Sequence, residues 1–457
     1  MNIIICGAGR VGFTIAKLLT EQNHSITVID QSSEDIKKIN DSLDVKAIVG
    51  KATFPSVLEN ANTKEADMII AVTRNDEINM MICQIAYSIF KVPKKIARIR
   101  SQDYLNPKFS KLYNKENLPI DVIISPELEI AKSIQRKLES PGALDNVPFA
   151  GNKIRLLEIF IEENCPIANI KLNELTKKFP KLNANILGVV RDEKFIFLKK
   201  NDLMKVNDKV YVTINSIQIK ETLSAFGHDE KISNNILIIG GGNVGFNLAK
   251  NIEESFEDAR LKIIEKDKER AEFIANELSN TIVINGNGLD EDILAEVNLD
   301  DVETVLALTN DDEDNLMVSV LVEKFSKNKI TMALINKPNY ALLQSSLKID
   351  YLIDPRMTTV SSILKHVHKG SIETAYTILN GEYEVIEAEI IETSELINKE
   401  LKNSNLPDEI RIGAVLRKDE IIIPRSNFVF KNEDIVVLLA KRDQLSIVEN
   451  MFRLSSV

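Results

Sequence analysis

The chain carries the same glycine-rich turn twice, and each copy directly follows a short apolar run. The first copy is Gly7-Ala8-Gly9-Arg10-Val11-Gly12, and the second, about half a chain later, is Gly240-Gly241-Gly242-Asn243-Val244-Gly245. Between a strand and a helix, the pattern G-x-G-x-x-G places backbone N–H groups around a pyrophosphate. Two copies at equivalent places predict a tandem pair of nucleotide-binding units.

The three glycines of each turn have separate tasks. The first permits the tight turn, the second lets backbone N–H groups approach a pyrophosphate, and the third lets the following helix pack on the sheet. The helix N-terminus adds free N–H donors and a partial positive charge. These glycines are Gly7, Gly9 and Gly12 in the first half and Gly240, Gly242 and Gly245 in the second. The alternatives are a purely structural glycine turn and a degenerate second site.

An acidic residue ends the next apolar run after each glycine turn. It is Asp30 in the first half and Glu265 in the second. About 20 residues after the turn, such a carboxylate accepts hydrogen bonds from the ribose hydroxyls and repels a 2′-phosphate. Both halves are therefore predicted to favour NAD or adenosine nucleotides over NADP.

Further ligand contacts are expected where the other apolar runs end, because open parallel sheets bind ligands at the carboxyl ends of their strands. The third run leads into Lys51, Ala52 and Thr53 and, in the second half, Asn287; the fourth leads into Thr73 and Arg74, and into Thr309 and Asn310; the fifth carries Arg98 and Arg100. Alternate residues on a strand share a face, so Arg98 and Arg100 could both face a phosphate. A partly exposed strand end without a ligand is the alternative.

Short apolar runs that alternate with helical patterns predict the α/β fold class. Residues 1–140 show this rhythm, with helical patterns that include residues 76–90 and 104–113, and residues 233–371 repeat it. Each of these segments is predicted to form a Rossmann-type, doubly wound parallel sheet with helices on both faces.

A smaller segment with a different rhythm follows each sheet. Pairs of apolar runs joined by Arg191-Asp192-Glu193 and by Arg417-Lys418-Asp419 predict hairpins, and a helical pattern ends each segment. These segments are predicted to be small α+β modules. The predicted domains are residues 1–140, 141–232, 233–371 and 372–457.

Composition narrows the class of function. The net charge of −11 disfavours a nucleic-acid binder, and the three cysteines lack the spacing of a metal site. The chain opens on an apolar run, and no run approaches the roughly 20 residues of a membrane helix. We therefore expect no transmembrane segment, no metal and a cytoplasmic location.

No catalytic set accompanies the predicted ligand loops. Hydride transfer needs a positioned acid or base, often His or Lys, beside the cofactor. The four histidines lie outside the predicted strand-end loops, and the small modules lack a polar cluster typical of a substrate pocket. We therefore expect no enzymatic activity, and we interpret the nucleotide as a signal rather than a reactant.

The whole chain resembles the TrkA family, the cytoplasmic regulatory subunits of bacterial Trk potassium-uptake systems. The resemblance rests on the first glycine turn, on the run ends Ala71-Val72-Thr73 and Ala307-Leu308-Thr309-Asn310, and on the alternating order of large and small segments. In that family the large segments are RCK (KTN) N-terminal nucleotide-binding domains and the small ones are RCK C-terminal domains.

The resemblance implies a role in gating. Family members bind NAD(H) and ATP or ADP, dock on a membrane-embedded TrkH- or TrkG-type potassium channel subunit, and form a dimer whose four nucleotide-binding domains make a ring. The protein would then associate peripherally with the inner face of the membrane through that subunit. Two hypotheses from other classes are an NAD-dependent oxidoreductase with duplicated domains and a soluble nucleotide sensor without a membrane partner.

The chain departs from the family pattern at two places. The family usually has Gly-Asp after the third strand, where this chain has Gly50-Lys51 and Gly286-Asn287. The family often has Asn or Asp after the fourth-strand threonine, where this chain has Arg74. These departures predict the loss of an acidic contact on the adenosine side, and Lys51 with Arg74 would favour a more highly charged ligand such as ATP.

Overall fold

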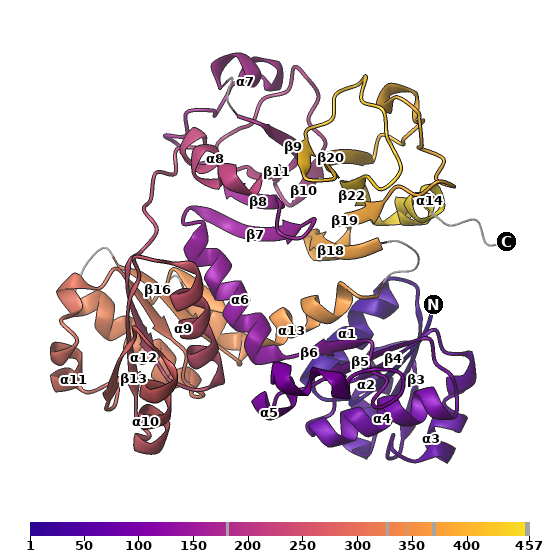
Figure 1. Ribbon diagram of the computed structural model, residues 1–457. Coiled ribbons are helices and arrows are strands. Elements are labelled where there is room, and N and C mark those ends of the chain that lie inside the picture. The colour runs from indigo at the N-terminus through magenta and orange to yellow at the C-terminus, as the bar shows by residue number, and fades with distance from the viewer. Residues whose placement is uncertain (180–181, 326–328, 345, 368–371, 453–457) are drawn as a thin grey trace. The chain divides into compact units, whose positions relative to one another are not determined.

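The computed structural model describes residues 1–179, 182–325, 329–344, 346–367 and 372–452 (Figure 1). It divides into two compact units, each made of two separate stretches of chain. Unit 1 is Met1–Ile134 with Ser233–Leu364, and unit 2 is Gln135–Ile232 with Lys365–Val457. The boundary predicted after residue 371 falls beside residues 368–371, which lie outside the described part.

The first sheet of unit 1 has six parallel strands in the order β3-β2-β1-β4-β5-β6. They are β1 Asn2–Cys6, β2 Ser25–Asp30, β3 Lys46–Val49, β4 Met68–Ala71, β5 Lys94–Arg98 and β6 Val122–Ile124. The central strands β1 and β4 are buried except at Asn2, which explains their near-continuous apolar sequences. The order reverses between β1 and β4, and ligands bind at such a switch point in folds of this kind.

The helices of this half are α1 Arg10–Glu21, α2 Ser33–Ser42, α3 Pro55–Asn60, α4 Asp76–Ser88, α5 Gln102–Leu105 and α6 Pro126–Glu139. The single helix predicted over residues 104–113 is wrong. The chain forms the short α5 and then a 3₁₀ helix, Pro107–Leu112, with Asn106 extended between them at φ −63° and ψ 125°. The cause is Pro107, because a proline disfavours helical geometry in the residue before it.

The second sheet of unit 1 repeats the first, in the order β14-β13-β12-β15-β16-β17. Its strands are β12 Asn235–Ile239, β13 Arg260–Glu265, β14 Ile282–Asn285, β15 Thr304–Ala307, β16 Ile330–Leu334 and β17 Tyr351–Ile353. Its helices are α9 Asn243–Ser255, α10 Lys268–Glu277, α11 Glu291–Glu296, α12 Asp312–Phe325 and α13 Pro355–Leu364. The predicted pair of doubly wound parallel sheets is confirmed.

Unit 2 contains two antiparallel five-stranded sheets, in the orders β10-β9-β11-β8-β7 and β18-β19-β22-β20-β21. The first module has β7 Ala143–Phe149, β8 Ile154–Phe160, α7 Leu172–Lys178, β9 Ala184–Arg191, β10 Lys194–Ile196, β11 Lys209–Asn215 and α8 Ile219–Ala225. The second has β18 Ile372–Ile378, β19 Tyr383–Glu389, β20 Ile410–Arg417, β21 Glu420–Ile422, β22 Ile435–Lys441 and α14 Leu445–Met451. The predicted α+β modules and their hairpins are confirmed.

The two modules of unit 2 share one buried interior. A single buried apolar cluster contains Leu156 and Leu187 of the first module and Val385 and Val437 of the second. A side-chain contact also joins them: Asn185 Nδ2 donates to the carbonyl oxygens of Ile412 and Gly413, at 2.9 and 3.1 Å. The two sheets therefore stabilise each other by excluding water from a common core.

A buried carboxylate lies where these modules meet. The Tyr376 hydroxyl contacts Asp145 Oδ2 at 2.9 Å and Glu158 Oε2 at 3.3 Å. Burial and the nearby Asp145 charge raise the pKa of Glu158, while Lys209 and the hydrogen bonds from Tyr211 and Tyr376 act in the opposite direction. The charged form of Glu158 is thus disfavoured in the folded protein.

Glu158→Gln is expected to stabilise the protein at neutral pH. Because the folded-state pKa of Glu158 is above its unfolded value, its stabilisation is present below the unfolded pKa and is lost as the pH rises through the folded pKa. The amide has no such dependence and should raise the free energy of unfolding at pH 7 by on the order of 1 kcal/mol. Thermal unfolding at pH 5 and pH 7 measures this, with exposed Glu163→Gln as control; a lower Tm than wild type at pH 7 would contradict it.

Candidate functional site

The glycine turns of unit 1 press against neighbouring backbone, so their first and third glycines have no room for a side chain. Gly7 has a φ of +117°, and a Cβ there would lie 2.9 Å from the Val72 carbonyl carbon. A Cβ on Gly12 would lie 1.8 Å from the Gly7 oxygen. In the second half, Gly240 has a φ of +106°, and a Cβ on Gly245 would lie 2.1 Å from the Gly240 oxygen. These contacts fix the path of the turn.

The middle glycine of each turn faces open space instead. A Cβ on Gly9 or on Gly242 would meet no atom within 4 Å. Both residues are the N-caps of the helices that follow, and both have ordinary extended backbone, with φ −65° and −60°. The open space at Gly9 and Gly242 is therefore room for a ligand rather than for packing.

The helices after the glycine turns also lack caps. Neither α1 nor α9 has a side-chain cap or an acidic residue in its first turn. By contrast, Ser32, Asn75, Asp267 and Asp290 cap α2, α4, α10 and α11, each of which has acidic residues in its first turn. The N–H groups at the start of α1 and α9 are thus left for an anionic partner, which the helix dipole would favour.

The two predicted acidic residues accept hydrogen bonds from backbone N–H groups of the glycine turns. Asp30 accepts hydrogen bonds from the Ala8 and Ser32 N–H groups, at 2.7 and 2.8 Å. Glu265 accepts the equivalent pair from Gly241 and Asp267, also at 2.7 and 2.8 Å. A carboxylate has about four acceptor positions, so each one retains capacity for the hydroxyls of a ribose.

The longer acid of the second half is accommodated by a smaller residue in the turn. A Cβ on Gly241 would lie 2.3 Å from Ile274 Cδ1, 3.0 Å from Glu265 Oε2 and 3.2 Å from Glu265 Cβ. The equivalent residue in the first half is Ala8, which pairs with the shorter Asp30 at the same N–O distance. The Gly241–Glu265 pair and the Ala8–Asp30 pair therefore give the same hydrogen bond between the turn and the acid.

A buried asparagine fixes the loop after the fourth strand in each half, and the sequence analysis assigned it no role. Asn79 Oδ1 accepts from the Thr73 N–H and hydroxyl at 2.9 and 2.7 Å, and its Nδ2 donates to the Arg98 carbonyl at 2.8 Å. Asn315 makes the same contacts with Thr309 and the Leu334 carbonyl. The threonine-to-asparagine spacing, repeated in both halves, was the signal that could have identified them.

The basic residues of the first half contact different protein groups. Arg98, at the end of β5, directs its Nη2 to the Thr73 carbonyl at 2.6 Å, and its Nε is buried without a hydrogen-bond partner among the described residues. Burial and the neighbouring Arg100 lower the pKa of Arg98. Arg100 lies beyond the strand and pairs with Glu127, Nε to Oε1 at 2.8 Å. The two guanidinium groups therefore have different protein partners, the Thr73 carbonyl for Arg98 and the Glu127 carboxylate for Arg100.

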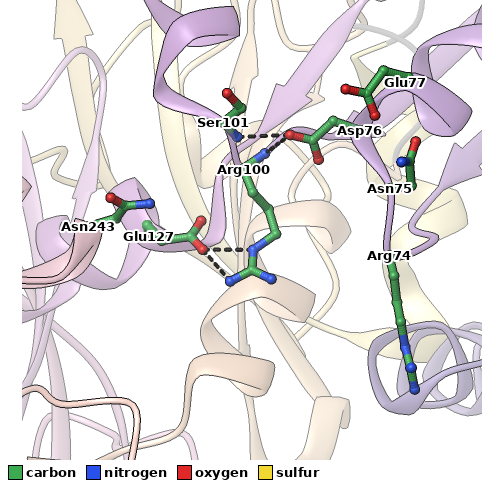
Figure 2. Close-up of a pocket in the computed structure, with 8 residues that line it drawn as sticks. All are labelled: Arg74, Asn75, Asp76, Glu77, Arg100, Ser101, Glu127 and Asn243. Atoms are coloured by element: carbon green, nitrogen blue, oxygen red, sulfur yellow. Dashed lines mark hydrogen bonds and ion pairs between the residues drawn. The ribbon is translucent and has the colours of Figure 1, made fainter.

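Figure 2 shows the Arg100–Glu127 pair in a pocket of about 360 Å³, which Arg74 and Asn243 also line. The exposed Arg74 side chain points away from Arg100 and Glu127. The Arg10 side chain contacts the second half of unit 1, where its Nη1 donates to the Asn336 carbonyl at 3.4 Å.

The remaining predicted residues of the first half lie in the loop after β3 and at the start of α1. Lys51 is exposed, with its Nζ 5.6 Å from the centre of the Phe54 ring. Ala52 is buried, whereas Thr53 and Val11 are partly exposed. The contact of Lys51 is thus with a neighbour in its own loop.

The second half contains a defined cavity at the carboxyl edge of its sheet. Its volume is about 330 Å³, and it brings together predicted residues from the glycine turn and three strand ends: Gly240, Gly242, Glu265, Asn287, Thr309 and Asn310. Val244 is partly exposed on α9. The lining also includes Arg270, which the sequence analysis did not select.

The chemistry of these groups suits an adenosine nucleotide. Uncapped helix N–H donors, an open space at the middle glycine and a carboxylate beside it match a pyrophosphate followed by a ribose. Among the described residues, no group of three or more His, Cys, Asp or Glu side chains is arranged to hold a metal ion. No helix of the described part is both long enough and apolar enough to cross a membrane.

Comparison with known proteins places the chain in a family. The TrkA-N domain matches residues 3–126 and 236–355, and the TrkA-C domain matches residues 156–227 and 385–453. The Trk system potassium uptake protein TrkA of Azorhizobium caulinodans is 40% identical over 455 residues, which cover 100% of this chain and 99% of that protein. The chain belongs to the TrkA family.

Other TrkA proteins and solved structures agree with this placement. The Trk system potassium uptake proteins TrkA of Vibrio alginolyticus and Haemophilus influenzae are each 34% identical, over 99% and 100% of this chain and 99% of each relative. The GsuK RCK domain has a TM-score of 0.59 at 15% identity, covering 99% of this chain and 94% of that one. The GsuK channel bound to NAD has a TM-score of 0.60 at 14% identity, covering 98% and 78%. These two structures show that the fold is shared.

Gly241→Ala is expected to destabilise unit 1, because the new Cβ collides with Ile274 and with Glu265. Overpacking of this kind costs about 1–3 kcal/mol. Adding Glu265→Asp, which recreates the pair found in the first half, should restore only the part of the lost stability that comes from Glu265, because the 2.3 Å approach of the new Cβ to Ile274 Cδ1 remains. Thermal unfolding of the single and double variants measures this, with Gly242→Ala as the control, since its Cβ meets open space. A Gly241→Ala protein as stable as wild type would contradict the argument.

Proposed function

We propose that this protein is the nucleotide-binding regulatory subunit of a Trk-type potassium-uptake system. It would bind NAD(H) and ATP or ADP in unit 1 and thereby control a membrane-embedded TrkH- or TrkG-type potassium channel subunit. The observation that carries the proposal is the pair of uncapped helix N-termini, each with open space at its middle glycine and a carboxylate alongside. The names of the TrkA relatives, which are potassium-uptake proteins, support it.

The proposed ligand class follows from the chemistry of each turn. The diphosphate would lie against the N–H groups of α1 or α9, and the ribose hydroxyls would donate to Asp30 or Glu265. Both acids disfavour a 2′-phosphate, so NAD(H), ATP and ADP are preferred to NADP(H). Support comes from the GsuK channel bound to NAD, whose chain shares this fold.

The proposed site residues are those predicted from the sequence. In the first half they are Gly7, Ala8, Gly9, Arg10, Val11, Gly12, Asp30, Lys51, Ala52, Thr53, Thr73, Arg74 and Arg98. In the second they are Gly240, Gly241, Gly242, Asn243, Val244, Gly245, Glu265, Asn287, Thr309 and Asn310. To these we add Asn79 and Asn315, which position the threonine loops rather than contact the ligand.

Control of a channel requires that nucleotide binds two arrangements of the subunit with different affinity. The loop after β4 is one physical link, because Asn79 lies on α4 and holds Thr73 at the site. A phosphate that displaces this loop would act directly on α4. Helix α6, after Ser125-Pro126, is the second proposed lever.

The rest of the proposal concerns assembly. The chain would comprise four domains, residues 1–140, 141–232, 233–371 and 372–457, and would form a homodimer. It would have no enzymatic activity, and it would lie in the cytoplasm, attached to the inner face of the membrane through the channel subunit. Binding to nucleic acid is not part of this function, in keeping with the net charge of −11.

Alanine at the open glycines separates ligand binding from folding. Gly9→Ala and Gly242→Ala should each keep the wild-type Tm, since the new Cβ meets no protein atom, yet each should abolish nucleotide binding in its own half by filling the phosphate space. Calorimetric titration with NADH, NAD, ATP and ADP measures binding, and Asp30→Ala and Glu265→Ala test the ribose contact. The double variant Gly9→Ala/Gly242→Ala should bind none of the four.

Undiminished binding by that double variant would show that the turns are not the nucleotide sites. Binding without any change in potassium flux through a co-purified channel subunit would refute the gating role and favour a soluble sensor. A substrate-dependent absorbance change at 340 nm would instead favour an oxidoreductase.

A further inference from the structure

Arg270 lies against the second glycine turn, at a place where the first half has no cation. Its Nε donates to the Gly241 carbonyl at 2.9 Å, and its Nη2 lies 3.4 Å from Asn243 Oδ1. Gly241 is in the turn, and Asn243 is the first residue of α9. The guanidinium is therefore held beside the N–H groups that would receive a diphosphate.

Two aromatic rings hold this side chain in place. The Arg270 guanidinium carbon lies 5.3 Å from the centre of the Phe246 ring and 4.9 Å from that of Phe273. The two rings also contact each other, with centres 5.6 Å apart. Burial lowers the pKa of Arg270, whereas Glu265 raises it, and an arginine remains charged under either influence. The site thus presents a fixed positive charge before any ligand arrives.

The equivalent residue of the first half is Asp35. Ser32 caps α2 by accepting from the Asp35 N–H at 3.2 Å, and Asp267 caps α10 by accepting from the Arg270 N–H at 2.8 Å. The two residues therefore occupy the same position in the first turn of matching helices. At this helix position the first half has an acid, Asp35, whose Oδ1 lies 3.7 Å from Lys38 Nζ, and the second half has the base Arg270.

Two cations of the first half, Arg74 and Arg98, lie on the other side of the glycine turn, whereas Arg10 is in the turn and Lys51 follows β3. Arg74 and Arg98 follow β4 and end β5, whereas α2 follows β2, and β2 and β4 flank β1 on opposite sides. The second half has neutral Asn310 and Leu334 at the corresponding strand ends. The duplicated units thus differ in where positive charge meets the phosphates.

We propose that Arg270 makes the second site selective for the adenosine diphosphate group, as found in ADP and NAD(H), and that Asp35 weakens this group's binding in the first site. The inference rests on the proposed function and adds to it that the two sites are unequal. At low concentrations of ADP the second site fills first. A guanidinium beside a diphosphate supplies charge-assisted hydrogen bonds, which are stronger than neutral ones.

The test isolates each site in the full-length protein. In a Gly9→Ala background, which blocks the first site, titration with ADP and with adenosine reports on the second site alone. Arg270→Gln should weaken ADP binding by about tenfold, with Arg270→Lys intermediate. Adenosine, which has no phosphate, should bind both variants as it binds the parent. Thermal unfolding of each variant checks that unit 1 remains folded.

The reciprocal variant tests the first site. In a Gly242→Ala background, Asp35→Arg should raise the affinity for ADP, and Asp35→Asn should raise it less. This gain of function does not depend on the aromatic packing around Arg270, so it remains informative if an Arg270 variant folds poorly.

The outcomes separate this inference from the proposed function. If neither site of the wild-type protein binds any of the four nucleotides, the proposed function fails. If ADP binds but Arg270→Gln leaves its affinity unchanged, or lowers ADP and adenosine affinity equally, only the selectivity assigned to Arg270 is overturned. Equal ADP affinity of the two isolated wild-type sites would overturn it as well.

Discussion

The close approach of each glycine turn to the end of the neighbouring strand is the constraint on which the rest of unit 1 depends. With no Cβ at Gly7 or Gly12, the turn lies directly on Val72 and the following helix starts against the turn. That position sets the N-terminus of the helix and brings the Ala8 N–H to the carboxylate of Asp30. The second half reaches the same arrangement through Gly240, Gly245 and Glu265. Ligand groups are thus positioned by backbone packing before any side chain contributes.

Within this shared frame the two halves have diverged in charge and in size. Alanine pairs with aspartate in one turn and glycine with glutamate in the other, so the N–O distance is kept although both residues changed. Around the turns, by contrast, Arg74 and Arg98 at the β4 and β5 ends have the uncharged counterparts Asn310 and Leu334, and the second half has Arg270 in the first turn of α10. The duplication therefore preserves the backbone geometry of the site and varies the electrostatics, which is the property that distinguishes one nucleotide from another.

Much of the fold was predictable because its signals are local. Buried parallel strands have apolar sequences, so both sheets could be predicted. The glycine turns and their acids follow a fixed spacing, and in the second half they line one cavity as expected. The edge strands β7 and β18 were missed: β7 mixes Asp145, Asn146 and Pro148 with apolar residues, which only an edge position tolerates. Asn79 and Arg270 were missed because their roles depend on carbonyl oxygens that the folded chain brings to them from distant positions. The different partners of Arg98 and Arg100 likewise depend on contacts that the folded chain brings together, with the Thr73 carbonyl and the Glu127 carboxylate.

The common core of unit 2 means that half of this chain would not be a self-sufficient protein. Each module hides one face of its sheet against the other, so a polypeptide with a single copy of the repeat would expose that face to water. Such a half would need a second half to pair with, as an obligate dimer does, and its folding would depend on concentration. Covalent linkage of the two copies replaces that encounter with an intramolecular one, which does not depend on protein concentration. Fusion also allows the two modules to differ in sequence, because within one chain the first module always pairs with the second and not with another copy of itself.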